Sequence, residues 1–320
     1  MEVAIQSLSS IIPSLPPLSS STNPALALFH DHSASSQIVN LLRQPNSGSG
    51  DNNLCRWFYD TFQSNVPELQ LLVLRFIPTI AGVYLSRIAN RKPQAGFEAV
   101  LLALYAHETN SRAGQAITVT IPDMSHPSIY HESKATTVKN NATELNIAVI
   151  SPSLEPHGTV RSTRRARIVG VALELYYTKI TQMPVSSKIE FCEFSKLWAG
   201  QDGDMYRDAD DGKVEQGGKL MTEEEKKLKK KEGRIPLPWD LLQPVLRVLG
   251  HCLMGVNNDM DKKLIVAASE ACRCLHARSM HDINPKAILA TGSLLSLSKS
   301  IEKGDLLDPT EIPRTNIIQL

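Results

Sequence analysis

The sequence predicts a mainly α-helical fold, an irregular multi-helix bundle or stack of α-hairpins with a small two-stranded β element. Aromatic residues make up only 5% of the 320 residues, so the core must be built from Leu, Ile, Val and Ala. Such cores are commonest where helices pack on helices. Apolar residues recur at helical spacing through most of the chain, and alternating β-branched residues occur in two short stretches.

Residues 1–33 are rich in Ser, Pro and Leu without a steady period, which predicts a flexible N-terminal arm. No Lys or Arg precedes Arg43, so the arm does not resemble a signal peptide or a presequence. We expect a helical domain over residues 34–305 and a tail over 306–320. Within the domain, the hydrophilic stretch 200–233 predicts an exposed charged insertion.

The first helices of the domain are expected in close succession. A short helix is expected at Ser35–Arg43 and a loop at Pro45–Asn53. Three longer helical segments then follow: Leu54–Ser64, Pro67–Ala89 and Gly96–Thr109. Pro78 should kink the second of these, because it removes a backbone donor and crowds the preceding turn. Arg75 and Pro78 near the middle of this apolar run favour a buried core helix over a transmembrane segment.

The pattern changes to that of strands after the third segment. Gln115–Ile121 alternates and is rich in β-branched residues, and Leu145–Ile150 is its expected pairing partner. Residues 124–141 between them have no clear period and predict a loop. Two strands alone are marginally stable, so we expect this pair to pack on helices.

Helical spacing returns in the second half of the chain. Arg164–Thr181 predicts one helix, and Ser186 or Ser187 is expected to cap the next, which runs to Trp198. Three C-terminal helices are expected from Leu-rich and Ala-rich repeats. Their expected boundaries are a stop at Gly255, a cap at Asn258 or Asp259, a start at Asn284–Pro285 and an end at Gly304.

The sequence predicts no catalytic residue, cofactor or metal. It contains neither the Walker spacing nor G-x-G-x-x-G, and neither the kinase tripeptides nor the G-x-S-x-G elbow. His107-Glu108 and His131-Glu132 each begin like a zincin helix but lack the second His four positions later. Cys272 and His276 share a helix face, but buried thiols beside a surface His are the simpler interpretation. The acidic residues after Asp202 do not fit the EF-hand register.

The five cysteines are odd in number and lie in helix-like stretches, which argues against a disulfide framework and for a reducing compartment. The net charge of +1 gives no global attraction to nucleic acid or to anionic membranes. Two local basic clusters remain, a Lys run at 226–231 and an Arg cluster. The members of the Arg cluster are Arg161, Arg164, Arg165 and Arg167.

Nearby Glu residues offset the Lys run, which favours an ordinary solvated face there. The Arg cluster has no acidic residue within it and stays open between a solvated face and a candidate lipid or partner contact. Neither cluster is interleaved with aromatic residues that could stack on bases, so no nucleic acid partner is expected.

Four segments resemble the hyccin family. The most specific is Val119–Ser133, VTIPDMSHPSIYHES, which contains Ile121, Pro122, Pro127, Tyr130, His131 and Glu132. The others are Pro67–Leu85 with Pro78 and Tyr84, Phe97–Tyr105, and Ile168–Pro184 ending in Met183-Pro184. In order and spacing these segments cover about residues 50–200. Within the first segment we expect Pro122 and Pro127 to fix a turn, Tyr130 to pack its ring while its hydroxyl meets a partner group, and His131 and Glu132 to tie the loop to a helix. For all of these signature residues the sequence leaves open whether the role is structural or partner-binding.

The resemblance implies a non-enzymatic subunit of the type III alpha phosphatidylinositol 4-kinase complex. It implies a tetratricopeptide-repeat scaffold protein as the direct partner, with a separate acylated protein anchoring the assembly. The expected location is therefore the cytosol and the cytoplasmic face of the plasma membrane. Two alternatives stay open: a peripheral membrane adaptor that binds anionic lipid through its basic clusters, and an enzyme of unfamiliar type.

Overall fold

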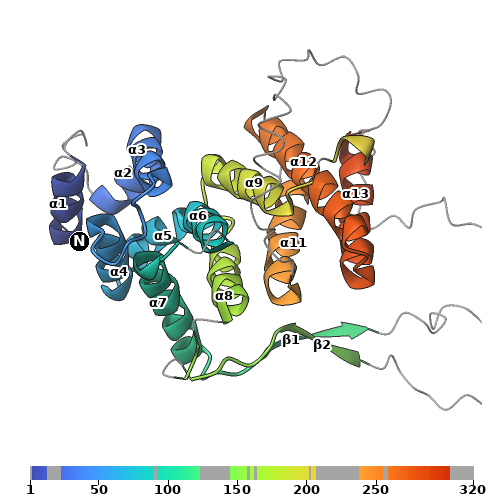
Figure 1. The fold of residues 1–320 in the computed structure, drawn as a ribbon, viewed down its shortest axis with the longest axis horizontal. Coiled ribbons are helices and arrows are strands. Elements are labelled where there is room, and N and C mark those ends of the chain that lie inside the picture. The colour runs from blue at the N-terminus through green and yellow to red at the C-terminus, as the bar shows by residue number, and fades with distance from the viewer. Residues whose placement is uncertain are drawn as a thin grey trace, which may run out of the picture. The chain divides into compact units, whose positions relative to one another are not determined.

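The computed structural model of this chain describes residues 2–12, 23–89, 92–122, 145–156, 159–161, 164–201, 203–206, 238–254 and 259–302. Across these residues the fold is mainly α-helical with one two-stranded antiparallel sheet, which confirms the predicted class (Figure 1). The chain divides into two compact units. We call Met1–Leu104 with Ser162–Leu320 the helical unit and Tyr105–Arg161 the ribbon unit.

The helical unit opens with three helices: α1 (Glu2–Ile11), α2 (Pro24–His30) and α3 (His32–Arg43). The first two correct the expectation of a flexible arm over residues 1–33. Leu8 and Phe29 are buried in the core, and the indole Nε1 of Trp57 donates a hydrogen bond of 2.7 Å to the carbonyl of Ala4. The apolar positions of these helices follow a helical period, but the many serines between them obscure it.

A loop at residues 44–52 joins α3 to α4 (Asn53–Gln63), as the sequence predicts. Arg87 of a later helix closes this loop. Its guanidinium donates hydrogen bonds to the Ser47 hydroxyl at 2.9 Å and the Arg43 carbonyl at 3.2 Å, and to the Gln44 and Ser47 carbonyls. The end of α3 is thereby capped from a distant part of the chain, since the last carbonyls of a helix lack partners within it.

The apolar run after α4 forms two helices rather than one kinked helix: α5 (Pro67–Arg75) and α6 (Ile77–Ala89). The break falls at Phe76, two residues before the predicted kink at Pro78, and the bend is 45°. Proline restricts the residue before it and is tolerated in the first turn of a helix, where its missing N–H would have no partner. Pro78 therefore lies in the first turn of a helix instead of bending one.

Three helices complete the middle of the chain: α7 (Ala95–Ser111), α8 (Arg165–Thr178) and α9 (Val185–Ala199). The predicted Ser186 or Ser187 cap of α9 is wrong, because Pro184 occupies the N-cap position without a side-chain hydrogen bond. Ser187 is instead buried, and its hydroxyl donates to the main-chain carbonyl of Arg75 at 2.7 Å. The Ser187 hydroxyl therefore bonds to a residue that is distant in sequence instead of capping its own helix.

The C-terminal helices of the helical unit are α11 (Trp239–Met254), α12 (Asp259–His281) and α13 (Pro285–Glu302). They pack on one another, α12 packs on α9, and α11 packs on α8 (Figure 1). The predicted start at Asn284–Pro285 is confirmed, since the Asn284 side chain accepts a hydrogen bond of 3.3 Å from the Ala287 N–H. Gly255, Asn258, Gly304 and the tail at 306–320 lie outside the described residues.

Most of the 200–233 stretch also lies outside the described residues, but its start is part of the fold. A 3₁₀ turn, η2 (Asp204–Tyr206), contacts α12, and the Tyr206 ring lies edge-on to His276 at 4.8 Å. A Cβ on Gly203 would overlap the backbone of α12 at Arg273. Gly203 and Tyr206, near the start of the expected exposed insertion, are therefore packed against α12, while Met205 between them is 78% exposed.

In the ribbon unit, β1 (Ile117–Pro122) pairs with β2 (Leu145–Ser151) in antiparallel register. The predicted pairing is thus confirmed, and the Cα partners include Val119 with Ala148 and Thr120 with Ile147. In the described part of the chain, no single helix has the length and hydropathy to cross a bilayer. Only the bent pair α5 and α6 passes that test jointly, and most of its residues are buried.

Candidate interaction site

The β1–β2 ribbon presents apolar side chains on both faces. Directly paired residues share a face, so Val119 and Ile121 lie on one side and Ile147 and Val149 on the other. Their side chains are well exposed, from 39% at Val119 to 69% at Ile147. This exposure contradicts the expectation that the pair packs on helices. Neither strand carries a charged residue, so the ribbon lacks the usual protection of an edge strand.

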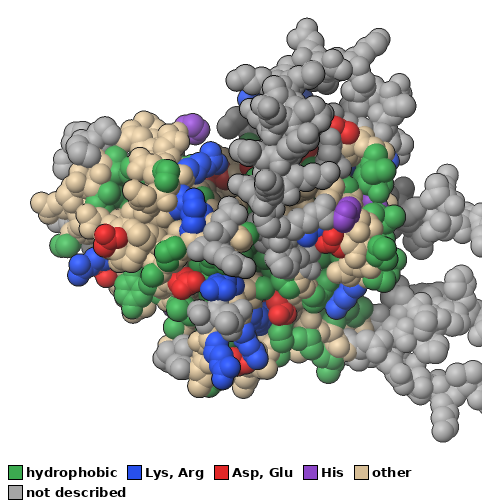
Figure 2. Space-filling model, viewed as in Figure 1, with side chains coloured by type: hydrophobic (Ala, Val, Ile, Leu, Met, Phe, Trp, Pro, Cys, Tyr) green, Lys and Arg blue, Asp and Glu red, His purple; other side chains and the backbone are tan. Residues whose placement is uncertain are grey.

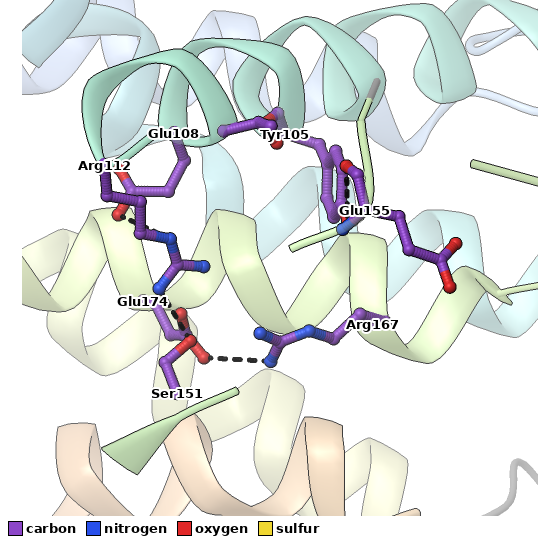
Figure 3. A network of polar contacts seen from close by, with 8 residues as sticks. Tyr105, Glu108, Arg112, Ser151, Glu155, Arg167 and Glu174 are labelled. Atoms are coloured by element: carbon purple, nitrogen blue, oxygen red, sulfur yellow. Dashed lines mark hydrogen bonds and ion pairs between the residues drawn. The ribbon is translucent and has the colours of Figure 1, made fainter. Parts of the chain in front are cut away.

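Polar contacts hold the root of the ribbon (Figure 3). The Glu155 N–H donates to the Tyr105 hydroxyl at 3.0 Å, and the guanidinium of Arg112 donates to the Ser151 hydroxyl at 2.9 Å. Arg112 also lies 3.7 Å from the carboxylate of Glu108, one turn earlier in the helix. The end of β2 and the segment after it are thus bonded to α7 and to the residue that follows this helix, so the ribbon has an ordered base.

The described residues of the family-like segments fall into two groups. Ile121 is half exposed at the end of β1, and Pro122 pairs with Leu145 as the last residue of that strand. Pro78, Tyr84 and Met183 are buried. Pro184 caps α9. The predicted turn and loop residues Pro127, Tyr130, His131 and Glu132 lie outside the described residues.

Tyr84 shows how a buried member of this set is used. Its hydroxyl donates a hydrogen bond of 3.0 Å to the carboxylate of Glu98 on α7. Burial, with Glu98 adding to it, raises the pKa of Tyr84, so the phenol stays protonated and remains a donor. The same carboxylate lies 3.6 Å from Arg165. Tyr84, Glu98 and Arg165 therefore link α6, α7 and α8.

The predicted Arg cluster does not form one surface patch. Arg167 is buried and its guanidinium lies 3.3 Å from the carboxylate of Glu174, one of the few acidic residues in the core. Arg165 is half exposed and faces Glu98. Arg164 is exposed just before α8, and Arg161 is exposed in the ribbon unit. Arg167 is thus corrected from a candidate lipid or partner contact to a structural residue.

The other charges on the helical surfaces are partly compensated in the same way. On the face shown in Figure 2, Asp and Glu side chains lie beside several Lys and Arg side chains. Lys196 is an example, since its Nζ lies 2.7 Å from the carboxylate of Glu270 and 3.2 Å from that of Glu193. Both carboxylates raise the pKa of Lys196, against the opposing effect of burial.

A buried cation that the sequence did not identify as structural lies at the centre of the helical unit. Arg75 is 2% exposed, and its guanidinium donates to the main-chain carbonyl of Phe29 and to the Ser186 hydroxyl at 3.3 Å. The Thr79 hydroxyl donates to Glu190 at 3.1 Å beside it, and burial raises the pKa of that carboxyl. These contacts join α2, α5, α6 and α9. The sequence feature that could have indicated this structural role was a single Arg within an apolar run.

The cysteine and histidine side chains that could suggest a metal are also used in packing. Cys272 is buried, and burial raises the pKa of its thiol to about 12. His276 Nδ1 lies 3.0 Å from the Thr291 hydroxyl. Among the residues that the structure describes, no three His, Cys, Asp or Glu side chains converge as metal ligands. Cys272 is therefore part of the core, and His276 contributes to the contact of α12 with α13.

A groove of about 660 Å³ lies between α1 and α4. Small side chains such as Ala4 and Ser7 line one wall, and Trp57 and Arg56 lie on the other. It contains no buried cluster of titratable groups, and the Trp57 N–H is already bonded to the backbone of α1.

A comparison with protein-family models decides the classification. The model described as Hyccin matches residues 19–316, nearly the whole chain. This chain belongs to the hyccin family. The match confirms the resemblance carried by the four segments, and it extends further than they do. It begins inside the expected N-terminal arm and includes the 200–233 stretch. In this hyccin-family chain, buried polar residues such as Arg75, Thr79 and Ser187 link helices, while the ribbon exposes uncharged apolar surface.

Proposed function

We propose that this chain is a non-enzymatic scaffold and regulatory subunit of a phosphatidylinositol 4-kinase complex. In this role it binds a tetratricopeptide-repeat scaffold protein, and the pair supports the stability of the type III alpha kinase. An acylated anchor protein brings the assembly to the plasma membrane, where it promotes phosphatidylinositol 4-phosphate production. The observation that carries the proposal is the family match over residues 19–316.

The exposed ribbon supports a binding role and supplies a mechanism. Contiguous exposed apolar surface on a folded protein marks interaction sites, and both faces of this ribbon are lined by β-branched side chains. A helical-repeat protein has concave grooves that can receive such an element. Binding to the folded chain also raises its stability, by about 2.7 kcal/mol when the partner is present at one hundred times its Kd.

Co-expression with the scaffold protein, followed by affinity capture and thermal melting, tests the proposal. We expect co-purification and a higher melting temperature for the pair than for the chain alone. An unchanged melting temperature and no capture would contradict the proposed role. Kinase activity measured with and without this subunit then separates a regulatory role from a purely positional one.

The ribbon can be tested within the same experiment. Ile147→Lys with Val149→Lys introduces two charges into the exposed face and should weaken capture at least tenfold. Val266→Lys with Met280→Lys is the matched control, because it adds the same two charges at residues that are 56% and 46% exposed but lie on α12. Equal capture of both variants would show that the scaffold contacts another surface.

The second candidate function, direct binding of anionic lipid through the Arg cluster, has less support. Arg167 is buried with Glu174 and Arg165 faces Glu98, so within the cluster Arg161 and Arg164 are the exposed members. Charge reversal of Arg164, assayed by liposome sedimentation, tests this alternative. A large loss of lipid binding would favour it over the scaffold role.

A further inference from the structure

The edge of β1 that faces away from β2 is open. Within the described residues the sheet consists of β1 and β2 alone, so β1 has a neighbouring strand on one side only (Figure 1). The register shift of this sheet adds Ile150 to β2 and leaves β1 continuous from Ile117 to Pro122. The backbone N–H and C=O groups of an open edge can pair with a further strand, and charges or a central proline usually prevent this. β1 has no charge, and its proline is its last residue.

The sequence of β1 indicates which strand fits this edge. Its first five residues read I-T-V-T-I, which is the same in both directions, whereas β2 contains no such palindrome. Two copies of β1 that run antiparallel about a two-fold axis at Val119 therefore bring identical residue types together. Ile117 of one copy faces Ile121 of the other in this register. Thr118 likewise faces Thr120, and Val119 faces its own equivalent.

Each pair in this register favours association. Cross-strand pairs of β-branched residues and Thr–Thr pairs both stabilise sheets, and an uncharged strand meets no like charge when it pairs with itself. The side chains of Ile117, Val119 and Ile121 are exposed and alternate onto one face of the ribbon, so pairing of two copies doubles the width of this apolar face. A sheet of two strands is marginally stable, and two further strands strengthen it.

We propose that β1 pairs with β1 of a second copy of this chain, antiparallel about Val119, to form a four-stranded sheet of order β2-β1-β1-β2. A two-fold contact requires a surface that is complementary to itself. The palindrome supplies this property for the side chains, and the open edge supplies it for the backbone. A single pair of strands is a small interface, so we expect a weak dimer. The inference needs only this chain and does not depend on the proposed function.

Analytical ultracentrifugation of the full chain over micromolar concentrations tests the proposal. Thr118→Lys with Thr120→Lys places two pairs of like charges in the interface and should weaken the dimer at least tenfold. Ile147→Lys with Val149→Lys is the matched control, because it adds the same charge to the other strand of the ribbon. In the dimer the two β2 strands are three strand spacings, about 14 Å, apart, which exceeds the Debye length of about 8 Å. The control should therefore keep most of the self-association.

An exchange of charge identifies the partner as a second copy. Thr118→Glu with Thr120→Glu should also be monomeric by itself. An equimolar mixture of the Glu and Lys variants should dimerise, because each Lys then faces a Glu across the two-fold axis. Recovery in the mixture also shows that both variants fold.

Cysteine cross-linking tests the register. Val119→Cys places two thiols directly opposite each other, where the Cα atoms of an antiparallel pair lie about 4.5–5.5 Å apart and a disulfide can form. Ile121→Cys is the matched control on the same face, because its equivalent in the second copy lies four residues away along the strand, about 14 Å. Diamide oxidation should give a reducible dimer with Val119→Cys and none with Ile121→Cys, and the original chain with its five cysteines is the blank.

Three results would overturn the proposal: an original chain that stays monomeric, equal losses of self-association in the β1 and β2 variants, or a mixture of charge variants that does not dimerise. Cross-links at Ile121→Cys as abundant as those at Val119→Cys would also overturn it, because they exclude the palindromic register. Scaffold capture plays no part in these measurements, so failure here is separate from failure of the proposed function.

Discussion

Replacing Ile283 with glycine should stabilise the helical unit. Ile283 follows α12 with a φ of +49°, and the Asn284 N–H bonds to the Ser279 carbonyl while the Ile283 N–H bonds to the Met280 carbonyl. This is the Schellman pattern, in which glycine is the usual residue at the left-handed position. A left-handed conformation costs an L-residue about 1–2 kcal/mol. Ile283 is 79% exposed, so its side chain gains little from burial in return.

Part of this gain in stability is lost, about 0.5–1 kcal/mol, because glycine has a larger conformational entropy in the unfolded chain. We therefore expect Ile283→Gly to raise the free energy of unfolding by about 1 kcal/mol, measured from urea titrations at an unchanged slope. Ile283→Ala is the decisive comparison, because alanine removes the branched side chain but keeps the Cβ that causes the strain. If the glycine variant were no more stable than the alanine variant, the left-handed backbone would not be the source of the effect.

Three further predictions concern the helical unit. Arg87→Ala should lower the free energy of unfolding by about 2–3 kcal/mol, because the carbonyls at the end of α3 and in the loop at 44–52 lose a charged donor. In the same urea assay, Arg87→Lys should recover only part of the lost stability. Gly170→Ala should lower the free energy of unfolding by about 2 kcal/mol. The added methyl group overlaps the Asp240 carbonyl, which costs about 3 kcal/mol, and the higher helix propensity of alanine offsets about 1 kcal/mol of this. A rise in melting temperature would contradict this close approach of α8 and α11. Iodoacetamide at pH 8 should label half-buried Cys274 well before buried Cys272, because the Cys272 thiol has a pKa of about 12 and forms almost no thiolate. Mass spectrometry of the labelled peptides, with and without urea, checks this order.

The sequence was most informative where structure depends on local patterns. Spacing of apolar residues predicted most helices, alternation predicted both strands, and the Asn284–Pro285 pair marked the start of α13 correctly. The four hyccin-like segments also predicted the family that the wider comparison then showed. Each of these features depends on residues within one or two turns of one another.

The errors arose where a residue's role depends on a distant partner. Ser187 was expected to cap α9, but a buried acceptor at Arg75 competes for its hydroxyl. Arg167 was expected at the surface, but it is buried and pairs with Glu174, two turns later in the same helix. The exposure of Val149 also could not be anticipated, because alternation of apolar residues indicates a strand without showing what covers it.

The contacts of Arg75 and Trp57 bear on how this chain can be divided. A fragment that began at residue 34, where composition suggests that the domain starts, would lack both the Phe29 carbonyl and the Ala4 carbonyl. A guanidinium would then remain inside the protein without its main-chain acceptor, and an indole would lose its own. Such a fragment would be expected to unfold readily or aggregate, and its failure to bind a partner would reveal nothing about the surface that the partner uses.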